Sequence, residues 1–352
     1  HMGENAPIYS THINDHILTF GDTANLRAAI REMDLSGRFE AIAVAVSSST
    51  AIIGFDVESF CEEEQDKVKA RLIPIAFSAL GTDYTVGLTR AMELFFKTYV
   101  EACLQKPRSY NILGCCADEY LIENDIKEIQ RTLSEMFDYH CRMSYPLNTS
   151  LREIRFAAEA EFNIVLRQEA LPAAIWMKER FNIPYVFSDC YGIQEMKKLL
   201  KEVSEVIRVS PRCAQLDSVN ALSAHDKEKH VLILGNQNSA NGLLRCLTEE
   251  LEMHNVYAMA FSTTTHNKSI QPYKEEILEK QMRDTGPDIL IGNSILFDFP
   301  GHAPSIDIPL LKPVGIAMKT PRPHYPLRGI SGYNQLTLML EGKGKGNVLF
   351  GE

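Results

Sequence analysis

Short apolar runs alternate with amphipathic stretches along most of the chain. The apolar runs, rich in Val, Ile, Leu and Phe, predict buried strands, while the amphipathic stretches have the period of helices with one polar face. The predicted strands cover 41–49, 73–80, 110–114, 140–144, 162–166, 184–188, 231–235, 255–263, 288–294 and 314–319. The predicted helices cover 55–72, 86–104, 125–137, 150–160, 170–181, 192–207 and 273–284.

This strand–helix–strand order is typical of an α/β fold with parallel sheets. Breaks near residues 107 and 225 divide the chain into three similar units. We therefore expect three doubly wound, Rossmann-like parallel-sheet domains around a central cleft. Their predicted ranges are 1–107, 108–225 and 226–352.

The composition excludes several classes of protein. The 352 residues are 45% hydrophobic and 23% charged, and their formal net charge of -10 disfavours nucleic acid as a partner. Neither an apolar run of transmembrane length nor a signal-peptide pattern is evident, so we expect a cytoplasmic protein without a membrane partner. Eight irregularly spaced cysteines also fit a reducing compartment rather than a disulfide framework.

Cysteines follow two of the predicted strands. Cys115 and Cys116 come directly after 110–114, and Cys190 comes after 184–188. Because ligands bind at the carboxyl ends of parallel strands, these thiols are candidate ligands for an Fe–S cluster or another soft metal. Two alternatives remain open for the adjacent pair: small buried core residues, or a strained vicinal disulfide.

Other polar groups also lie at predicted strand ends. The loop "GNQNSANG" (235–242) lacks the spacing of a nucleotide-binding motif, so no nucleotide is expected, and we favour a tight turn with Ser239 as the helix N-cap. His266 follows the strand 255–263. Asp118 and Glu119 are expected to form or cap the first turn of the next helix.

A Pro- and Arg-rich segment near the end of the chain could bind an anion. His324 lies in "KTPRPHYPLRGISGY" together with Arg322, Arg328 and Tyr333. Basic side chains in a loop suit an anionic ligand. A solvated surface loop is an equally good interpretation.

Several segments, in order, resemble the nitrogenase component 1 superfamily from about residue 20 to about residue 342. This group includes nitrogenase subunits, cofactor-assembly scaffolds and dark-operative protochlorophyllide reductases. The segments with this similarity are "GDTANLRAAIREM" (21–33), "AVAVSSSTAIIGFDVESF" (43–60), "YNILGCCADEYLIENDIKEIQRTLSEM" (110–136), "LNTSLREIRFAAEAEFNIVL…WMKERFNIPYVF" (147–187), "TGPDILIGNS" (285–294) and "RGISGYNQLTLMLE" (328–341).

Departures from the family pattern limit what the resemblance implies. Ser48 stands where members that hold an interface cluster have a cysteine, although a serine alkoxide can ligate iron. Leu166 or Arg167 stands at the position of the cysteine that holds the nitrogenase cofactor. His324 is near the position of the cofactor histidine but out of register. We therefore expect a divergent member that is not a nitrogenase catalytic subunit.

The resemblance implies a redox subunit with an Fe–S cluster or other metal centre in the cleft. Cys115, Cys116 and Cys190 would be its ligands, and Ser48, Arg167, His266, His324 and Tyr333 would contact the cofactor or substrate. Electrons would come from an ATP-dependent iron protein, and the chain would form a homodimer or heterodimer. The alternatives are a non-catalytic scaffold for a metallocluster or tetrapyrrole, and a cluster-free partner in a heterodimer.

Overall fold

The computed structural model describes residues 8–11, 21–47, 50, 52, 54–76, 83–212, 222–262, 267–292, 306–310 and 325–343. The chain divides into two compact units between Ala91 and Met92. All the strands within each sheet run parallel. The prediction of an α/β fold built on parallel sheets is confirmed.

In the described part of the amino-terminal unit, two helices accompany a parallel pair of strands. Strand β1 (Ala41–Ala45) pairs with β2 (Arg71–Ile75), and α2 (Ala24–Leu35) and α4 (Val57–Gln65) accompany them. The side chains that form its core come from all four elements and from the residue before β2: Ile30, Ile42, Val44, Val57, Phe60, Cys61, Ala70 and Leu72. Helix α5 (Tyr84–Tyr99) crosses the boundary between the units.

The helix predicted over 55–72 ends earlier than its sequence pattern indicates. Gln65, its last helical residue, donates a hydrogen bond to the carbonyl of Ala70 and accepts one from the backbone N–H of Leu72. Asp34 accepts hydrogen bonds from the backbone N–H groups of Lys69 and Ala70. These side-chain bonds stabilise a turn, so that β2 begins at Arg71.

The larger unit contains two parallel sheets. The middle sheet has the strand order β4-β3-β5-β6. Its elements are β3 (Ser109–Cys115), α6 (Ile122–Phe137), β4 (His140–Pro146), α7 (Leu151–Arg155), β5 (Phe162–Val165), α8 (Leu171–Phe181), β6 (Tyr185–Phe187) and α9 (Ile193–Ile207). Short 3-10 turns, Ala157–Glu159 and Gln168–Ala170, precede β5 and α8.

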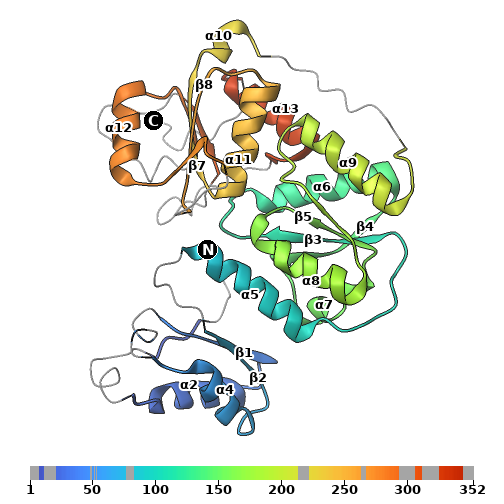
Figure 1. Ribbon diagram of the computed structural model, residues 1–352, viewed down its shortest axis with the longest axis vertical. Helices are drawn as coiled ribbons and strands as arrows, with labels where there is room; N and C mark the ends of the chain where they lie inside the picture. Colours follow the sequence, from blue (N-terminus) through green and yellow to red (C-terminus); the bar gives the residue numbers. More distant parts are fainter. Residues whose placement is uncertain are drawn as a thin grey trace. The chain divides into compact units, whose positions relative to one another are not determined.

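Helices cover both faces of the middle sheet. Tyr110 and Ile112 of β3 pack with α6 and α9 in one apolar cluster, while α8 lies on the opposite side of the strands (Figure 1). Every residue of β3 is buried, as expected for a central parallel strand. The helix predicted over 150–160 is shorter than expected, because α7 ends at Arg155 and a 3-10 turn follows it.

The carboxyl-terminal sheet has the strand order β11-β10-β7-β8-β9. Its elements are α10 (Ala224–Lys227), β7 (His230–Gly235), α11 (Gln237–Arg245), a π turn (Cys246–Glu250), β8 (Asn255–Ala260), β9 (Ile270–Pro272), α12 (Glu275–Thr285), β10 (Ile289–Gly292), β11 (Ile306–Pro309) and α13 (Gly329–Leu340). Strands β9 and β11 were not predicted from the sequence. The strand predicted over 314–319 lies outside the described residues.

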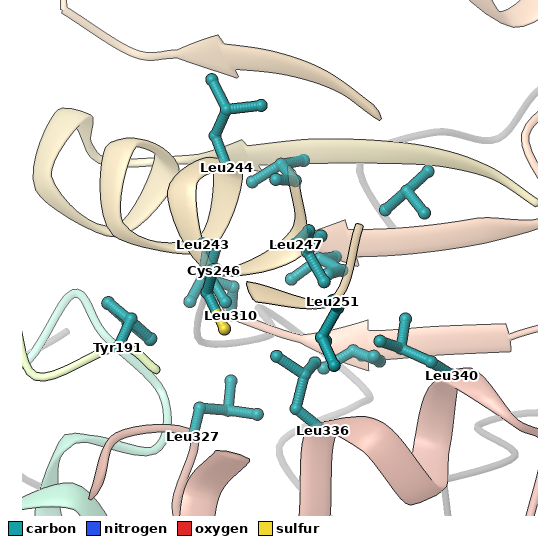
Figure 2. Packing of buried hydrophobic residues seen from close by; sticks show 14 of the residues in the cluster. Tyr191, Leu243, Leu244, Cys246, Leu247, Leu251, Leu310, Leu327, Leu336 and Leu340 are labelled. Atoms are coloured by element: carbon teal, nitrogen blue, oxygen red, sulfur yellow. The ribbon is translucent and has the colours of Figure 1, made fainter. Parts of the chain in front are cut away.

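Alternate residues of β7 point to opposite faces of this sheet. Val231 and Ile233 face a cluster with α11 and α13, whereas Leu232 and Leu234 face α12. Figure 2 shows the first cluster, in which Tyr191, between β6 and α9, lies close to side chains of the carboxyl-terminal sheet and α13. The two sheets of the larger unit therefore share apolar packing.

Helix α13 also contacts α6 and α9 of the middle sheet. Each of the three sequence units contains one of the observed sheets, and the domain boundaries at 107 and 225 stay predictions. Among the described residues, no helix is both long and apolar enough to cross a membrane.

Candidate functional site

A fully buried arginine lies at the carboxyl ends of β3 and β5. Arg167 follows β5, and its side chain is 0% exposed. Its Nη1 donates to both carboxylate oxygens of Asp118 at 2.7 and 2.9 Å. Its Nε and Nη2 donate to the two oxygens of Glu169, each at 3.3 Å. Arg167 thus joins the loop after β3 to the turn after β5.

A second buried arginine comes from the segment before α13. Arg328 donates through Nη1 to Glu119 and Asp125, and through Nε to the carbonyl oxygen of Asp189. Asp125 also accepts hydrogen bonds from the backbone N–H groups of Leu327 and Arg328. The guanidinium carbon of Arg328 lies 4.6 Å from the ring centre of Tyr191. These contacts fix the segment against the middle sheet.

Asn236 connects the two sheets. Its Oδ1 accepts hydrogen bonds from the backbone N–H groups of Asn238 and Ser239, so Asn236 is the N-cap of α11. Its Nδ2 donates to Glu119 at 2.9 Å, and the Ser239 hydroxyl lies 3.3 Å from the same Glu119 oxygen. The prediction of Ser239 as the N-cap is therefore wrong. A carboxylate of the chain itself lies at the start of this helix.

Two further contacts join the turn after β5 to α11. Asn238 accepts a hydrogen bond from the backbone N–H of Gln168 and donates one to Glu169. Farther along the helix, Arg245 donates through both terminal nitrogens to Asp189 at 3.1 and 2.8 Å. The sheets are thus held together by hydrogen bonds and ion pairs as well as by apolar packing.

Gly242 of α11 permits this close approach. A Cβ at this position would lie 2.5 Å from the ring of Tyr191 and 2.8 Å from the carboxyl carbon of Asp189. These distances are too short for a real carbon contact, so any larger residue would push α11 away from the middle sheet. The loop "GNQNSANG" therefore serves packing between the sheets.

The residues around the two arginines form one network, which we call the Arg–carboxylate network. Its members are Arg167, Arg328, Asp118, Glu119, Asp125 and Glu169. Both arginine side chains are 0% exposed, and three of the carboxylates are 2 to 3% exposed. Asp118 is 30% exposed. Asp118 is therefore the member of this network that reaches solvent.

Burial and the arginines change the acidity of these carboxyl groups in different directions. Burial raises the pKa of Asp118, against the opposing effect of Arg167. Burial also opposes ionisation of Glu119, but the guanidinium groups of Arg328 and Arg167 outweigh it and lower the pKa of Glu119. Asp118 and Glu119 point to the arginines and do not cap α6, whose N-cap is Leu121. The expectation that they cap this helix is wrong.

The three candidate cysteine ligands are buried. The side chains of Cys115 and Cys190 are 0% exposed and belong to the apolar cluster under α6 and α9, and Cys116 is 4% exposed. Burial raises the pKa of the Cys190 thiol to about 12 and also raises those of Cys115 and Cys116. All three are thiols without a disulfide partner.

Within the part of the chain that the structure describes, these thiols do not gather into a cluster of potential metal ligands. A cluster needs several thiolates that converge on one point, and a thiolate is costly in an apolar environment. Among the residues that the structure describes, no group of three or more His, Cys, Asp or Glu side chains could hold a metal ion. Cys115, Cys116 and Cys190 are thus not brought together as ligands.

Of the remaining candidate residues, one lies in the Arg–carboxylate network, one lies in an apolar core, and three lie outside the described residues. Arg167 lies in the Arg–carboxylate network, whereas Tyr333 packs in the apolar cluster with α11, and burial raises its pKa to about 12. Ser48, His266 and His324 lie outside the described residues. Their proposed roles stay predictions.

The sequence is similar to one protein family over nearly its whole length. Residues 1–334 match the family described as nitrogenase component 1 type oxidoreductase. The chain belongs to the nitrogenase component 1 type oxidoreductase family. This confirms the resemblance found in the sequence.

Curated relatives of the family are distant and longer than this chain. The iron-molybdenum cofactor biosynthesis protein NifE of Nostoc sp. is 24% identical over 200 residues, which cover 56% of this chain and 41% of NifE. A light-independent protochlorophyllide reductase subunit of Nostoc sp. is 20% identical over 301 residues, or 77% of this chain and 59% of the relative. The chain thus spans between two fifths and three fifths of their length.

A solved structure shares the fold. The structure titled nitrogenase Cp1 at pH 6.5 superposes with a TM-score of 0.70 at 13% identity, and covers 95% of this chain and 81% of the other. At this identity the likeness concerns the fold of the component 1 family and not the chemistry of its sites.

Proposed function

We propose that the chain is a ligand-binding subunit of a nitrogenase-like assembly, in which the middle sheet supplies no thiolate to a metal centre. The observation that supports this is the contrast at the strand ends. Cys115 and Cys190 lie in an apolar core, while Asp118 is held at the edge of the sheet by Arg167. The ligand would be a metallocluster or tetrapyrrole, as in a cofactor-assembly scaffold.

Arg167 takes part indirectly in this proposal. Its guanidinium is occupied by Asp118 and Glu169 and is fully buried, so it positions these carboxylates and does not contact the ligand itself. Asp118 and Gln168 are partly exposed at this edge. An Fe–S or other metal centre remains a prediction that concerns residues outside those described, including Ser48.

Metal analysis after anaerobic purification tests the role of the cysteines. We expect the iron and sulfide content of the triple variant C115A/C116A/C190A to equal that of the unchanged protein. Cys246→Ala, which removes a buried thiol from the carboxyl-terminal sheet, is the matched control. Stoichiometric iron that disappears only in the triple variant, with circular dichroism unchanged, would contradict the proposal.

A binding titration tests the ligand class. The protein is mixed anaerobically with protoporphyrin IX, or with ferrous iron and sulfide, and the bound species is measured by absorption after gel filtration. We expect one of the two to remain bound, and binding to weaken when Asp118→Lys introduces a cation at the edge. Uptake of neither would favour the cluster-free partner of a heterodimer.

A redox subunit that receives electrons from an ATP-dependent iron protein is the second candidate function. A carboxylate at a strand edge favours it, because reductions consume protons as well as electrons. The test combines the protein with such an iron protein, MgATP and dithionite. ATP-dependent reduction of a bound ligand is expected for a redox subunit, and its absence with a loaded protein indicates a carrier.

The predicted dimer has its own test. Light scattering behind a size-exclusion column gives the mass of the particle in solution. A mass near twice that of one chain indicates a homodimer. A single-chain mass that increases when a co-expressed paralogue is present indicates a heterodimer.

A further inference from the structure

A pocket lies between α6 and the edge strand β4 of the middle sheet. Its volume is about 410 Å³, which is within the range of small-molecule sites in proteins. Glu123, Ile126 and Lys127 line it from one face of α6, and Leu147 and Glu153 line it from the turn after β4 and from α7. The residues of the Arg–carboxylate network are all described, and none of them lines this pocket. The pocket is therefore separate from that network.

The form of β4 favours a small molecule over an added peptide strand. In the described sheet, β4 lies at the edge with β3 as its neighbour. Its register against β3 shifts between Cys141 and Met143, which leaves Arg142 outside the pairing as in a β-bulge. The strand ends at Pro146, which has no backbone N–H to donate. Because bulges and prolines keep edge strands from pairing with other chains, we do not expect a peptide to extend this sheet.

Lys127 brings a positive charge to the pocket that no described residue neutralises. Its ammonium group forms neither an ion pair nor a hydrogen bond within the part of the chain that the structure describes. Arg142 also lines the pocket, but its guanidinium is paired with Glu159. Of these two cations, Lys127 is therefore the one available to a ligand.

Glu153 brings a negative charge to the pocket from a different element. Its Oε2 accepts hydrogen bonds from the backbone N–H and the hydroxyl of Ser150, at 2.7 and 2.6 Å, in the capping box that starts α7. Since both bonds use the same oxygen, Oε1 keeps its capacity to accept. Among the described residues, Glu153 and Lys127 line one pocket without pairing with each other.

This arrangement of charges selects for a ligand that carries both signs. A simple anion would bind Lys127 but would also meet the carboxylates of Glu123 and Glu153. A simple amine would suit the carboxylates but leave Lys127 without a partner. Like charges placed together are unfavourable and opposite charges are favourable, so a zwitterion fits the lining better than either. Ile126 and Leu147 add apolar surface for the body of the ligand.

We propose that this pocket binds a small zwitterion with an apolar body, of the amino-acid or dipeptide class. Lys127 binds its carboxylate, and Glu153 binds its ammonium group through Oε1. Ile126 and Leu147 contact its apolar part. The proposal does not depend on the ligand proposed for the edge formed by β3 and β5, so either can fail without the other.

Saturation-transfer NMR of the full chain tests the ligand class, with L-leucine and leucylglycine as the zwitterionic probes. 4-Methylpentanoate is leucine without its amino group, and 3-methylbutylamine is leucine without its carboxyl group. We expect saturable binding of a zwitterion, and binding about tenfold weaker for each analogue, because each loses one charged contact. Saturable binding of neither zwitterion, or equally tight binding of an analogue, would overturn the proposal.

Charge-removing variants test the location of the site. Lys127→Gln changes an exposed position, and Glu153→Gln keeps a side chain that can complete the capping box, so both variants should fold. We expect Lys127→Gln to remove the preference for leucine over 3-methylbutylamine, and Glu153→Gln to reduce the preference over 4-methylpentanoate. Circular dichroism confirms the fold of each variant.

The control for Lys127 is a lysine on another helix. Lys201 of α9 is 78% exposed and lies 4.0 Å from Glu205. Lys201→Gln should leave the binding of both zwitterions unchanged. An effect of Lys201→Gln as large as that of Lys127→Gln, or unchanged preferences in both pocket variants, would show that the zwitterion does not bind in this pocket.

Discussion

Asn236 of the carboxyl-terminal sheet donates a hydrogen bond to Glu119 of the middle sheet at 2.9 Å. The same amide side chain caps α11 through its oxygen. One residue therefore starts a helix in one sheet and partners a buried carboxylate of the other. Stability of the helix and attachment of the sheets should change together when it is replaced.

Asn236→Ala should lower the free energy of unfolding by about 2 kcal/mol, because it removes a cap and a partner of a buried carboxylate. Urea unfolding followed by the fluorescence of Trp176 measures the loss. Ser223→Ala, which removes the exposed cap of α10, should cost only about 0.5 kcal/mol. Equal losses for the two variants would mean that the contact with Glu119 contributes nothing.

Arg328→Met should lower the free energy of unfolding by about 4 kcal/mol, because Glu119 and Asp125 would keep their charges in a buried site without their partner. Arg328→Lys should recover little of this, since an ammonium group cannot bond Glu119, Asp125 and the Asp189 carbonyl in the same geometry. Urea unfolding is again the measurement.

The control for Arg328 is a surface arginine with an acidic partner. Arg283 lies 3.6 Å from Glu279 on α12, and the two side chains are 66% and 39% exposed. Arg283→Met should cost about 0.5 kcal/mol, because solvent screens such pairs. A loss for Arg328→Met as small as this would show that the buried network does not hold the segment before α13.

Gly192→Ala should cost about 3 kcal/mol. The backbone of Gly192 has φ 88° and ψ 163°, which only glycine adopts readily, and a Cβ would lie 2.1 Å from Glu250 Oε1. The clash would displace the carboxylate that accepts the backbone N–H groups of Ile193 and Gln194 at the start of α9. Thermal unfolding monitored by circular dichroism would detect the change.

Gly286 provides a matched control for backbone strain. It also has a positive φ, 53°, but a Cβ there would meet nothing within 4 Å. Gly286→Ala should therefore cost only about 1 kcal/mol. The difference between the two glycine variants combines the contact with Glu250 and the more restricted backbone conformation of Gly192, and no difference would mean that neither adds to the cost of a positive φ.

The pH dependence of stability should be flatter in Asp118→Asn. Burial raises the pKa of Asp118 above its unfolded value, so the folded state binds more protons than the unfolded state between the two values. Its contribution is fully present below the unfolded pKa and is lost as pH rises through the folded pKa. Melting temperatures from pH 4 to 8 should fall less in the variant, and parallel curves would refute this.

Thiol labelling should divide the cysteines by burial. Cys115, Cys116 and Cys190 are 0 to 4% exposed with raised pKa values, so iodoacetamide should leave them unmodified in the native protein. Cys103 is partly exposed and should react first of these four. Peptide mass spectrometry before and after unfolding in urea gives the order. Rapid native labelling of Cys190 would place it outside the core.

The sequence pattern predicts the strands of the larger unit well but not the direction of side chains at their ends. A run such as "YNILG" is apolar on both faces, because helices cover both sides of a parallel sheet. It therefore indicates where the strand ends and not which way Cys115 points. Cys115 turns into the core under α6, whereas Asp118, only three positions later, faces Arg167.

The local sequence pattern could not predict the hydrogen-bond partners of Arg328. Asp125 is 203 positions away and begins the helix predicted over 125–137, where acidic residues are common for local reasons. Without an alignment, nothing in the sequence indicates that acidic residues near position 120 pair with an arginine at position 328. The family resemblance rests on the order of several sequence segments and not on individual side-chain contacts. It was confirmed by the match of residues 1–334 to the family.

Because α13 packs against α6 and α9, the middle sheet cannot complete its packing until the end of the chain has been synthesised. A ribosome completes the middle sheet long before it makes Arg328, so Glu119 and Asp125 leave the exit tunnel without their buried partner. A nascent chain that stops before residue 325 would carry these carboxylates exposed, with an open apolar face beside them. We expect a chaperone to bind such a chain until α13 has been synthesised.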